Sequence, residues 1–207
     1  PMNFSNWPLV VDLRTGAFAG GGGETSVLNA ASEQISNWLG LPSGVAASMT
    51  DAKAIDAQYG MEKALTAVTA GLAGGNLIYE SSGMPASLLG ASFEAFVLDD
   101  EMHSAIYRTL RGIEVTEETL GFSAICDAVR GEGHFLGATH TYEAMERDYF
   151  YPKLADRDAP KTWSDNGSTD AWQRARARVR EVLQSHKPDY LSPDKEAAIR
   201  SRFPILL

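Results

Sequence analysis

The alternation of apolar and polar positions along the chain predicts a repeated unit of strand, loop and helix. WPLVVDL (residues 7–13), SGVAASM (43–49) and NLIYE (76–80) have the short apolar composition of buried strands. Between them, apolar residues recur at steps of three or four, which is the spacing of an amphipathic helix. Strands that alternate with helices form parallel sheets with helical crossovers, so we expect an α/β fold.

The helical segments carry start and stop signals. Ser92 stands in the position of an N-cap, and the acidic run 99–101 points outward from the helix that follows it. Gly74–Gly75 supply the permissive backbone of a C-terminal cap to the preceding helix. We therefore expect helices at residues 24–39, from about 50 to 72, 93–113 and 116–129.

The character of the chain changes at about Gly131. The residues that follow are rich in aromatic and charged side chains and lack strand alternation, so we expect β/α units in residues 1–130 and a helical extension in residues 131–207. Residues 170–185 read as a helix with four arginines at two-residue spacing. That spacing spreads the guanidinium groups around the helix, which favours a solvated face over a phosphate-binding patch.

The charge balance argues against two kinds of partner. The chain has 27 acidic and 18 basic residues, a formal net charge of −9, which disfavours nucleic acid and anionic membranes. No apolar run reaches the roughly 18–20 residues of a membrane span. Cys126 is the only cysteine, so no intrachain disulfide can form, and we expect a buried inert thiol and a cytoplasmic protein. The chain lacks a signal segment and enters a strand at once, so we expect it to begin inside a domain.

The most informative segment is TDAKAIDAQYGME, residues 50–62, which follows a predicted strand. It places Asp51, Lys53 and Asp56 in the first turns of a predicted helix. Tyr79 and Glu80 end the NLIYE strand, and the carboxyl ends of parallel strands lie at one edge of a sheet. That edge is where β/α enzymes place their chemistry.

Three other motifs have structural explanations. The glycine run 20–23 lacks the Lys-Ser/Thr ending of a P-loop, so we interpret it as a βα loop. His134 and His140 are six residues apart and do not share a helix face, so no metal site is expected. Asp12 and Arg14 are interpreted as a structural ion pair.

Seven segments, taken in order, resemble one family of enzymes. They are DLRTG (12–16), the glycine-rich turn ending at Glu24, TDAKAIDAQYGME (50–62), GGNLIYESSG (74–83), FVLDDEMHSAIYRTLRGIEVTEET (96–119), GHFLGATHT (133–141) and the RD…W segment of 157–163. Together they resemble the C-terminal portion of the trimethylamine:corrinoid methyltransferase superfamily, in its pyrrolysine-free branch. The resemblance implies the C-terminal part of a TIM-type β/α barrel with a helical extension, completed by an N-terminal half of the barrel, because a closed barrel needs about 250 residues.

The resemblance also implies a reaction. A methyl group of a quaternary or tertiary amine, such as a betaine, is passed to the cobalt of a corrinoid on a separate protein, so this chain itself is expected to bind no cofactor and no metal. The cation would be held by carboxylates and an aromatic face, here Glu80, Asp51 or Asp56 with Tyr79. His140 would face the substrate or the corrinoid protein. A homo-oligomer is the expected assembly.

Lys53 is the candidate catalytic residue, because the resemblance places it where the founding enzymes carry pyrrolysine. A lysine ammonium repels a nearby trimethylammonium group but can pair with a substrate carboxylate, which points to betaines rather than to trimethylamine. The alternative is a surface lysine paired with Asp56 or Asp51.

A second function class stays open. The chain could be a noncatalytic binding or assembly module derived from a barrel fragment. Its exposed strand edges would then be covered by another copy or another polypeptide.

Overall fold

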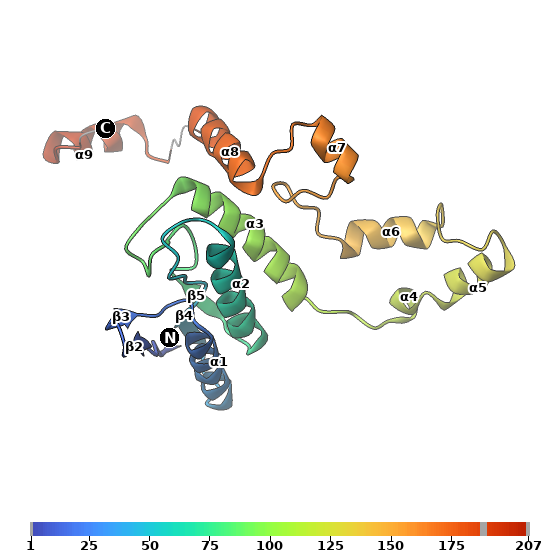
Figure 1. The fold of residues 1–207 in the computed structure, drawn as a ribbon, viewed down its shortest axis with the longest axis horizontal. Coiled ribbons are helices and arrows are strands. Elements are labelled where there is room, and N and C mark those ends of the chain that lie inside the picture. Colours follow the sequence, from blue (N-terminus) through green and yellow to red (C-terminus); the bar gives the residue numbers. More distant parts are fainter. Residues whose placement is uncertain (1, 187–189, 206–207) are drawn as a thin grey trace.

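A three-stranded parallel sheet forms the centre of the N-terminal half in the computed structural model, which describes residues 2–186 and 190–205 (Figure 1). Its strands are β1 (Phe4–Ser5), β4 (Ser43–Ala46) and β5 (Leu77–Tyr79), in the order β1-β4-β5. In register, Phe4 pairs with Ser43 and Ala46 pairs with Tyr79. The expected α/β architecture with a parallel sheet is confirmed, and the described residues do not close a barrel.

Three helices accompany the sheet. They are α1 (Gly23–Trp38), α2 (Ala57–Leu72) and α3 (Phe93–Leu110), which follow β1, β4 and β5 in the chain. The antiparallel pair β2 (Val11–Asp12) and β3 (Ala17–Phe18) lies between β1 and α1. Each parallel strand is therefore linked to the next by a helix, as the alternating pattern predicts.

The prediction of a strand over residues 7–13 is wrong. The strand of the parallel sheet lies earlier, at Phe4–Ser5, and only Val11–Asp12 of the predicted segment pairs, in the β2–β3 hairpin. Pro8 explains the interruption, because proline has no N–H to donate to a sheet and is excluded from central strands. The apolar composition of the segment indicates an extended backbone, but it does not determine which strand the segment pairs with.

The start of the second helix is also different from the prediction. The helix begins at Ala57, and residues 50–56 form a loop. Asp56 decides the boundary, because its side chain accepts hydrogen bonds from the backbone N–H groups of Gln58 and Tyr59 and so caps the helix. Asp51 and Lys53 consequently lie in the loop that follows β4 rather than on a helix.

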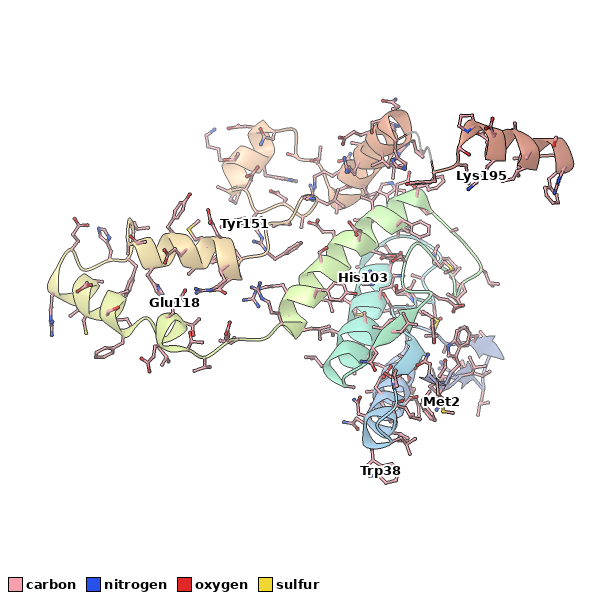
Figure 2. The ribbon with its side chains drawn as sticks, turned by 180° about the vertical axis from the view of Figure 1, so that it is seen from behind. Met2, Trp38, His103, Glu118, Tyr151 and Lys195 are labelled. Atoms are coloured by element: carbon pink, nitrogen blue, oxygen red, sulfur yellow. The ribbon has the colours of Figure 1, made fainter. Side chains whose placement is uncertain are left out.

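Small and polar side chains, rather than leucines, form the buried faces of α1 and α2. The buried residues are Thr25, Ser26, Asn29, Ser32, Glu33 and Ser36 on α1, and Tyr59, Lys63, Thr66, Ala67 and Ala70 on α2. Leu65 and Leu72, whose three- and four-residue spacing with Tyr59 and Val68 is that of an apolar helix face, are exposed. Trp38 at the end of α1 is also exposed and points away from the molecule (Figure 2). The two helices pack closely against each other through these small residues.

The segment after α3 forms an arm that extends away from the sheet (Figure 1). We define the arm as residues 113–150; it contains α4 (Glu117–Leu120), α5 (Phe122–Arg130) and α6 (Thr139–Asp148). The predicted single helix of residues 116–129 is broken at Gly121, whose φ of 60° lies in the left-handed region. Cys126 on α5 is half-buried rather than buried.

The chain then returns to α3. Three further helices follow, α7 (Pro160–Asp165), α8 (Ala171–Ser185) and α9 (Pro193–Arg202). The Glu101 carboxylate accepts the backbone N–H groups of Lys153, Leu154 and Ala155 at 2.9–3.1 Å, which fixes the returning segment on α3. α8 packs on α3 through Ala175 and Val179. None of the helices in the described ranges is long and apolar enough to cross a membrane, and the predicted division at residue 130 stays a prediction.

Candidate functional site

Asp51 joins three loops at the carboxyl ends of the strands. One carboxylate oxygen accepts the N–H of Gly20 at 2.8 Å and the hydroxyl of Ser87 at 2.7 Å, and the other accepts the N–H of Gly21 at 3.3 Å. The glycine run is therefore a βα loop held by a carboxylate, which agrees with its interpretation as a loop. Because its oxygens are already occupied, Asp51 serves to position the loops around it.

Glu62 makes a second junction in the same place. Its Oε2 accepts the Thr50 hydroxyl at 2.7 Å and the Asp51 N–H at 2.8 Å, and its Oε1 accepts the Gln58 amide at 2.8 Å. Glu62 therefore ties the start of the loop after β4 to α2, whereas Gln58 is an exposed partner on the same helix. Hydrogen bonds to the carboxylates of Glu62 and Asp51 therefore fix the start of the loop of residues 50–56.

Lys53 stands apart from these contacts. Its side chain is exposed, and the described part of the chain gives it neither a hydrogen bond nor an ion pair. The alternative pairing with Asp56 or Asp51 is therefore wrong for this structure, since Asp56 caps α2 and Asp51 binds the loops. Lys53 is an accessible ammonium group at the rim of the carboxyl-end face.

β5 ends at Tyr79, and Glu80 follows directly after it. The Tyr79 side chain lies over Gly44 of β4, its hydroxyl accepts the Asn3 amide at 2.8 Å, and its ring lies 6.2 Å from that of Trp7. Glu80 has a left-handed φ of 56°, which costs a non-glycine residue about 1–2 kcal/mol. Its Oε2 is buried and has no hydrogen-bonding partner in the ranges that the structure covers. A left-handed backbone and one buried, unpartnered carboxylate oxygen mark the half-buried Glu80 as a candidate ligand-binding group.

Beneath this face lies a buried ion pair that the sequence pattern did not reveal. Lys63 Nζ lies 3.1 Å from Asp99 Oδ2 and 5.2 Å from the centre of the Tyr59 ring, with both charged side chains at most 1% exposed. The same Asp99 oxygen accepts the Tyr59 hydroxyl and the Gly83 N–H, each at 2.7 Å. The Lys63 contact is electrostatic rather than a well-aligned hydrogen bond. Asp99 thus faces inward, contrary to its predicted outward position.

The environment of this pair shifts the protonation equilibria. Burial lowers the pKa of Lys63, and the neighbouring Asp99 opposes that shift. Burial, together with the Asp99 charge, raises the pKa of the Tyr59 hydroxyl. The charged lysine therefore depends on Asp99, which in turn holds Gly83 in the loop that follows Glu80.

The pair could have been found from helix spacing. Lys63 is four residues after Tyr59 and four before Ala67, and Asp99 is four residues after Ala95, so each charge lies on a buried stripe. Opposite charges on the buried stripes of successive helices are a signal for an internal ion pair. Within the acidic run 99–101, only Asp99 lies on the buried stripe of α3, so the outward prediction for the whole run is wrong at that residue.

His103 on α3 (labelled in Figure 2) is a half-buried titratable group that feels the charges of both members of this pair. Its Nε2 lies 3.1 Å from the hydroxyl of Ser48, a residue with a left-handed φ of 57° just after β4. Burial lowers the pKa of His103 and Lys63 lowers it further, whereas Asp99 and Asp100 raise it. The net direction is downward, so the folded state favours a neutral imidazole.

The pKa of His103 predicts a pH dependence of stability. The unfolded histidine takes up a proton as the pH falls below 6.5, but the folded one resists protonation until a lower pH. Its stabilising contribution is therefore complete above 6.5 and is lost as the pH falls toward the folded pKa, at up to about 1.4 kcal/mol per pH unit. Urea unfolding between pH 7.5 and 5.5 should show a steeper loss for the native protein than for His103→Gln. Equal pH profiles would contradict this assignment.

The remaining candidate residues lie elsewhere. His140 is on α6 in the arm, where its Nε2 lies 2.9 Å from the Glu118 carbonyl oxygen, and it does not meet the residues of the carboxyl-end face. Asp12 and Arg14 form the expected ion pair, at 2.7 Å, in the turn of the β2–β3 hairpin. Across the described residues, no group of three or more His, Cys, Asp or Glu side chains could hold a metal ion.

The fold and the site define a β/α protein whose polar side chains gather at the carboxyl ends of parallel strands. The family model described as trimethylamine methyltransferase (MTTB) matches residues 1–203. The chain therefore belongs to this family, as its sequence motifs predict.

Curated relatives have two kinds of names. The chain is 30% identical over 201 residues to the glycine betaine methyltransferase of Desulfitobacterium hafniense strain Y51, covering 97% of this chain and 42% of the relative. It is 32% identical over 201 residues to the trimethylamine methyltransferase MttB of another strain of that species, covering 97% and 40%. To MttB of Methanosarcina barkeri it is 35% identical over 184 residues, covering 88% and 36%. The chain thus spans about two fifths of the length of these relatives.

Proposed function

We propose that this chain is the C-terminal part of a β/α barrel methyltransferase that moves a methyl group from a quaternary or tertiary amine to the cobalt of a corrinoid protein. Membership of the MTTB family and the names of the relatives support this reaction class. The three-stranded sheet would continue into the remaining strands of the barrel, contributed by an N-terminal half.

One observation carries the proposal, the buried and unpartnered carboxylate oxygen of Glu80 at the end of β5. A buried carboxylate without a hydrogen-bond donor is costly unless a cation compensates it. A quaternary ammonium has no N–H to donate, so it compensates the charge without needing hydrogen-bond geometry. Glu80 would hold such a cation, and the ring of Tyr79, the residue before it, would add an aromatic face.

The other residues of the face would position the substrate. A methylated ammonium leaves as a neutral amine, so the chain must align and desolvate the methyl group and needs no general base. When bound by its own protein, a corrinoid supplies a nucleophilic cobalt centre that accepts the methyl group. Asp51 and Glu62 hold the loops after β1, β4 and β5 together, which fixes the rim to which the substrate and the corrinoid protein would bind.

Lys53 would select betaines within this scheme. Its ammonium is exposed and makes no contact in the described residues that would have to be broken. A betaine carries a carboxylate that an ammonium can bind, whereas free trimethylamine offers nothing for that charge. Asp56, as the cap of α2, would contribute negative charge nearby rather than a direct contact.

The experiment that tests this function measures methyl transfer to cob(I)alamin, and binding by calorimetry, for a panel of betaines and trimethylamine. The protein used contains this chain together with the rest of its coding region. We expect a betaine to bind more tightly than trimethylamine. Lys53→Ala should weaken betaine binding by about tenfold to a hundredfold with unchanged thermal stability, the cost of losing one charged contact.

The control is Lys161→Ala, which removes another exposed lysine, on α7, and should leave betaine binding unchanged. Equal affinity for trimethylamine and every betaine would refute the selectivity. A Lys53→Ala protein that loses thermal stability but keeps its affinity would assign Lys53 a structural role.

A noncatalytic assembly module is the second candidate, and the open edges of the sheet favour it. Among the described strands, β1 and β5 each pair on one side only. A module would bind another polypeptide at such an edge. Reading the coding region upstream of Pro1 distinguishes the two, because in-frame β/α units support the enzyme and a start codon at this point supports the module.

A further inference from the structure

The arm presents a large apolar surface that nothing in the described chain covers. On α5, Ala124 and Ala128 are half-buried and line a hollow together with residues at the start of α6, whereas Phe122, Ile125 and Val129 are exposed, with Phe122 at 72% and Val129 at 76%. These three positions are spaced by three and four residues, so they form one stripe along the helix. An amphipathic helix whose apolar stripe faces solvent marks an interaction surface.

The arm is also acidic. Between residues 113 and 150 the chain has eight Asp and Glu residues and only two Arg residues. Glu114 and Glu117 are exposed at the start of α4, close in sequence to the apolar stripe. A partner for this surface should therefore combine apolar side chains with positive charge.

The C-terminal tail of the same chain has those properties. We define the tail as residues 174–186 and 190–205, which contain seven Arg and Lys residues and three acidic ones. Its exposed apolar side chains include Leu183, Tyr190 and Phe203. Lys195 and Arg202 lie seven residues apart on α9, and hence on one face of that helix.

The two surfaces lie far apart in this structure. In Figure 1, α5 lies at one extreme of the structure and α9 at the other, with α3 and the sheet between them. Contact between two copies of the chain would let each surface find its complement. A two-fold dimer would form the arm–tail contact twice.

We propose that the arm of one copy binds the tail of a second copy of this chain, with the stripe Phe122, Ile125 and Val129 against the apolar residues of the tail and acidic arm residues against basic tail residues. The occupant is a second copy because the complementary charge and apolar area are both on this chain. The contact is independent of the proposed methyl transfer.

Sedimentation velocity over a range of micromolar concentrations tests the apolar part of this contact. We expect a dimer that Phe122→Asp with Val129→Asp converts to monomer, raising the dissociation constant at least about 100-fold, since each substitution removes a central apolar contact. Leu13→Asp is the matched control. It removes a still more exposed apolar side chain, 94% exposed, from the β2–β3 hairpin and should leave the mass unchanged.

Charge reversal tests the pairing of arm with tail. Glu114→Arg with Glu117→Arg should weaken the dimer, as should Lys195→Glu with Arg202→Glu. The protein that carries all four substitutions should regain the dimer. Such rescue would show that the charges of the arm and the tail contact each other, rather than that each is needed on its own for the protein to fold.

Three results would overturn the proposal. They are a monomer at every concentration, a dimer that persists in Phe122→Asp with Val129→Asp, and charge-reversed variants that fail to rescue each other. A lower melting temperature of these variants without a change of mass would also overturn it, because the stripe would then be covered within its own polypeptide.

Discussion

Replacing Lys63 by methionine is expected to lower the free energy of unfolding by about 3–5 kcal/mol, because it leaves the Asp99 carboxylate buried without its cation. Lys63 and Asp99 are at most 1% exposed, and water cannot take the place of the missing ammonium. Methionine matches the length of the lysine stem, so the loss reflects the charge rather than a cavity. Urea unfolding at neutral pH measures the difference.

Asp99→Asn in the Lys63→Met background should recover much of the loss. The amide oxygen is neutral and still accepts the Tyr59 hydroxyl and the Gly83 N–H, which the carboxylate now holds at 2.7 Å. Lys161→Met, at an exposed lysine with 86% of its side chain in solvent, should change stability by no more than about 0.5 kcal/mol. A loss for Lys63→Met as small as that of the control would mean that the pair is not buried in solution.

Replacing Gly21 by alanine is expected to cost about 2–4 kcal/mol and to disturb the carboxyl-end face. A Cβ at Gly21 would lie 2.7 Å from Cδ and 2.9 Å from Cβ of Glu62, so rotating the Glu62 carboxylate cannot relieve the contact. The Gly21 N–H also donates to Asp51, and the displaced loop would weaken that bond and those of Glu62 to Thr50 and Asp51. Thermal unfolding and methyl transfer should both decline.

Gly23→Ala is the matched control from the same glycine run. A Cβ there meets nothing within 4 Å, and Gly23 is the first residue of α1, so alanine should stabilise the helix by about 0.5–1 kcal/mol. Opposite signs for two glycines two residues apart would establish that close approach to Glu62, rather than backbone flexibility, requires Gly21. Equal effects would contradict that explanation.

Both variants act on the region around Glu80. The Lys63–Asp99 pair holds Gly83, three residues after Glu80, and the Asp51 and Glu62 junctions hold the loops beside it. The strained backbone of Glu80 can persist only where its surroundings fix it. The polar interior of this small sheet therefore holds the candidate substrate-binding residue in place.

Sequence patterns located most of the elements. The strand at 43–46, the helix that ends near Gly74 and the Ser92 cap all lie where their residues predicted, because caps and apolar runs act locally. The pairing of residues 7–13 and the register of the α2 faces were not predictable in this way. Both depend on which neighbour a segment contacts, and Leu65 is exposed because close packing between α1 and α2 selects small side chains.

The candidate site divides in the same manner. The positions of Asp51, Lys53, Tyr79 and Glu80 at strand ends follow from the order of strands and helices in the sequence, and so does membership of the family. Only the tertiary structure decided what each side chain does. In the folded chain, Asp51 accepts hydrogen bonds from loop N–H groups and Lys63 pairs with Asp99. Lys53 is exposed, and one oxygen of Glu80 has no partner among the described residues. The physical reason is that local order is set by neighbours along the chain, whereas the state of a charge is set by the groups that folding brings around it.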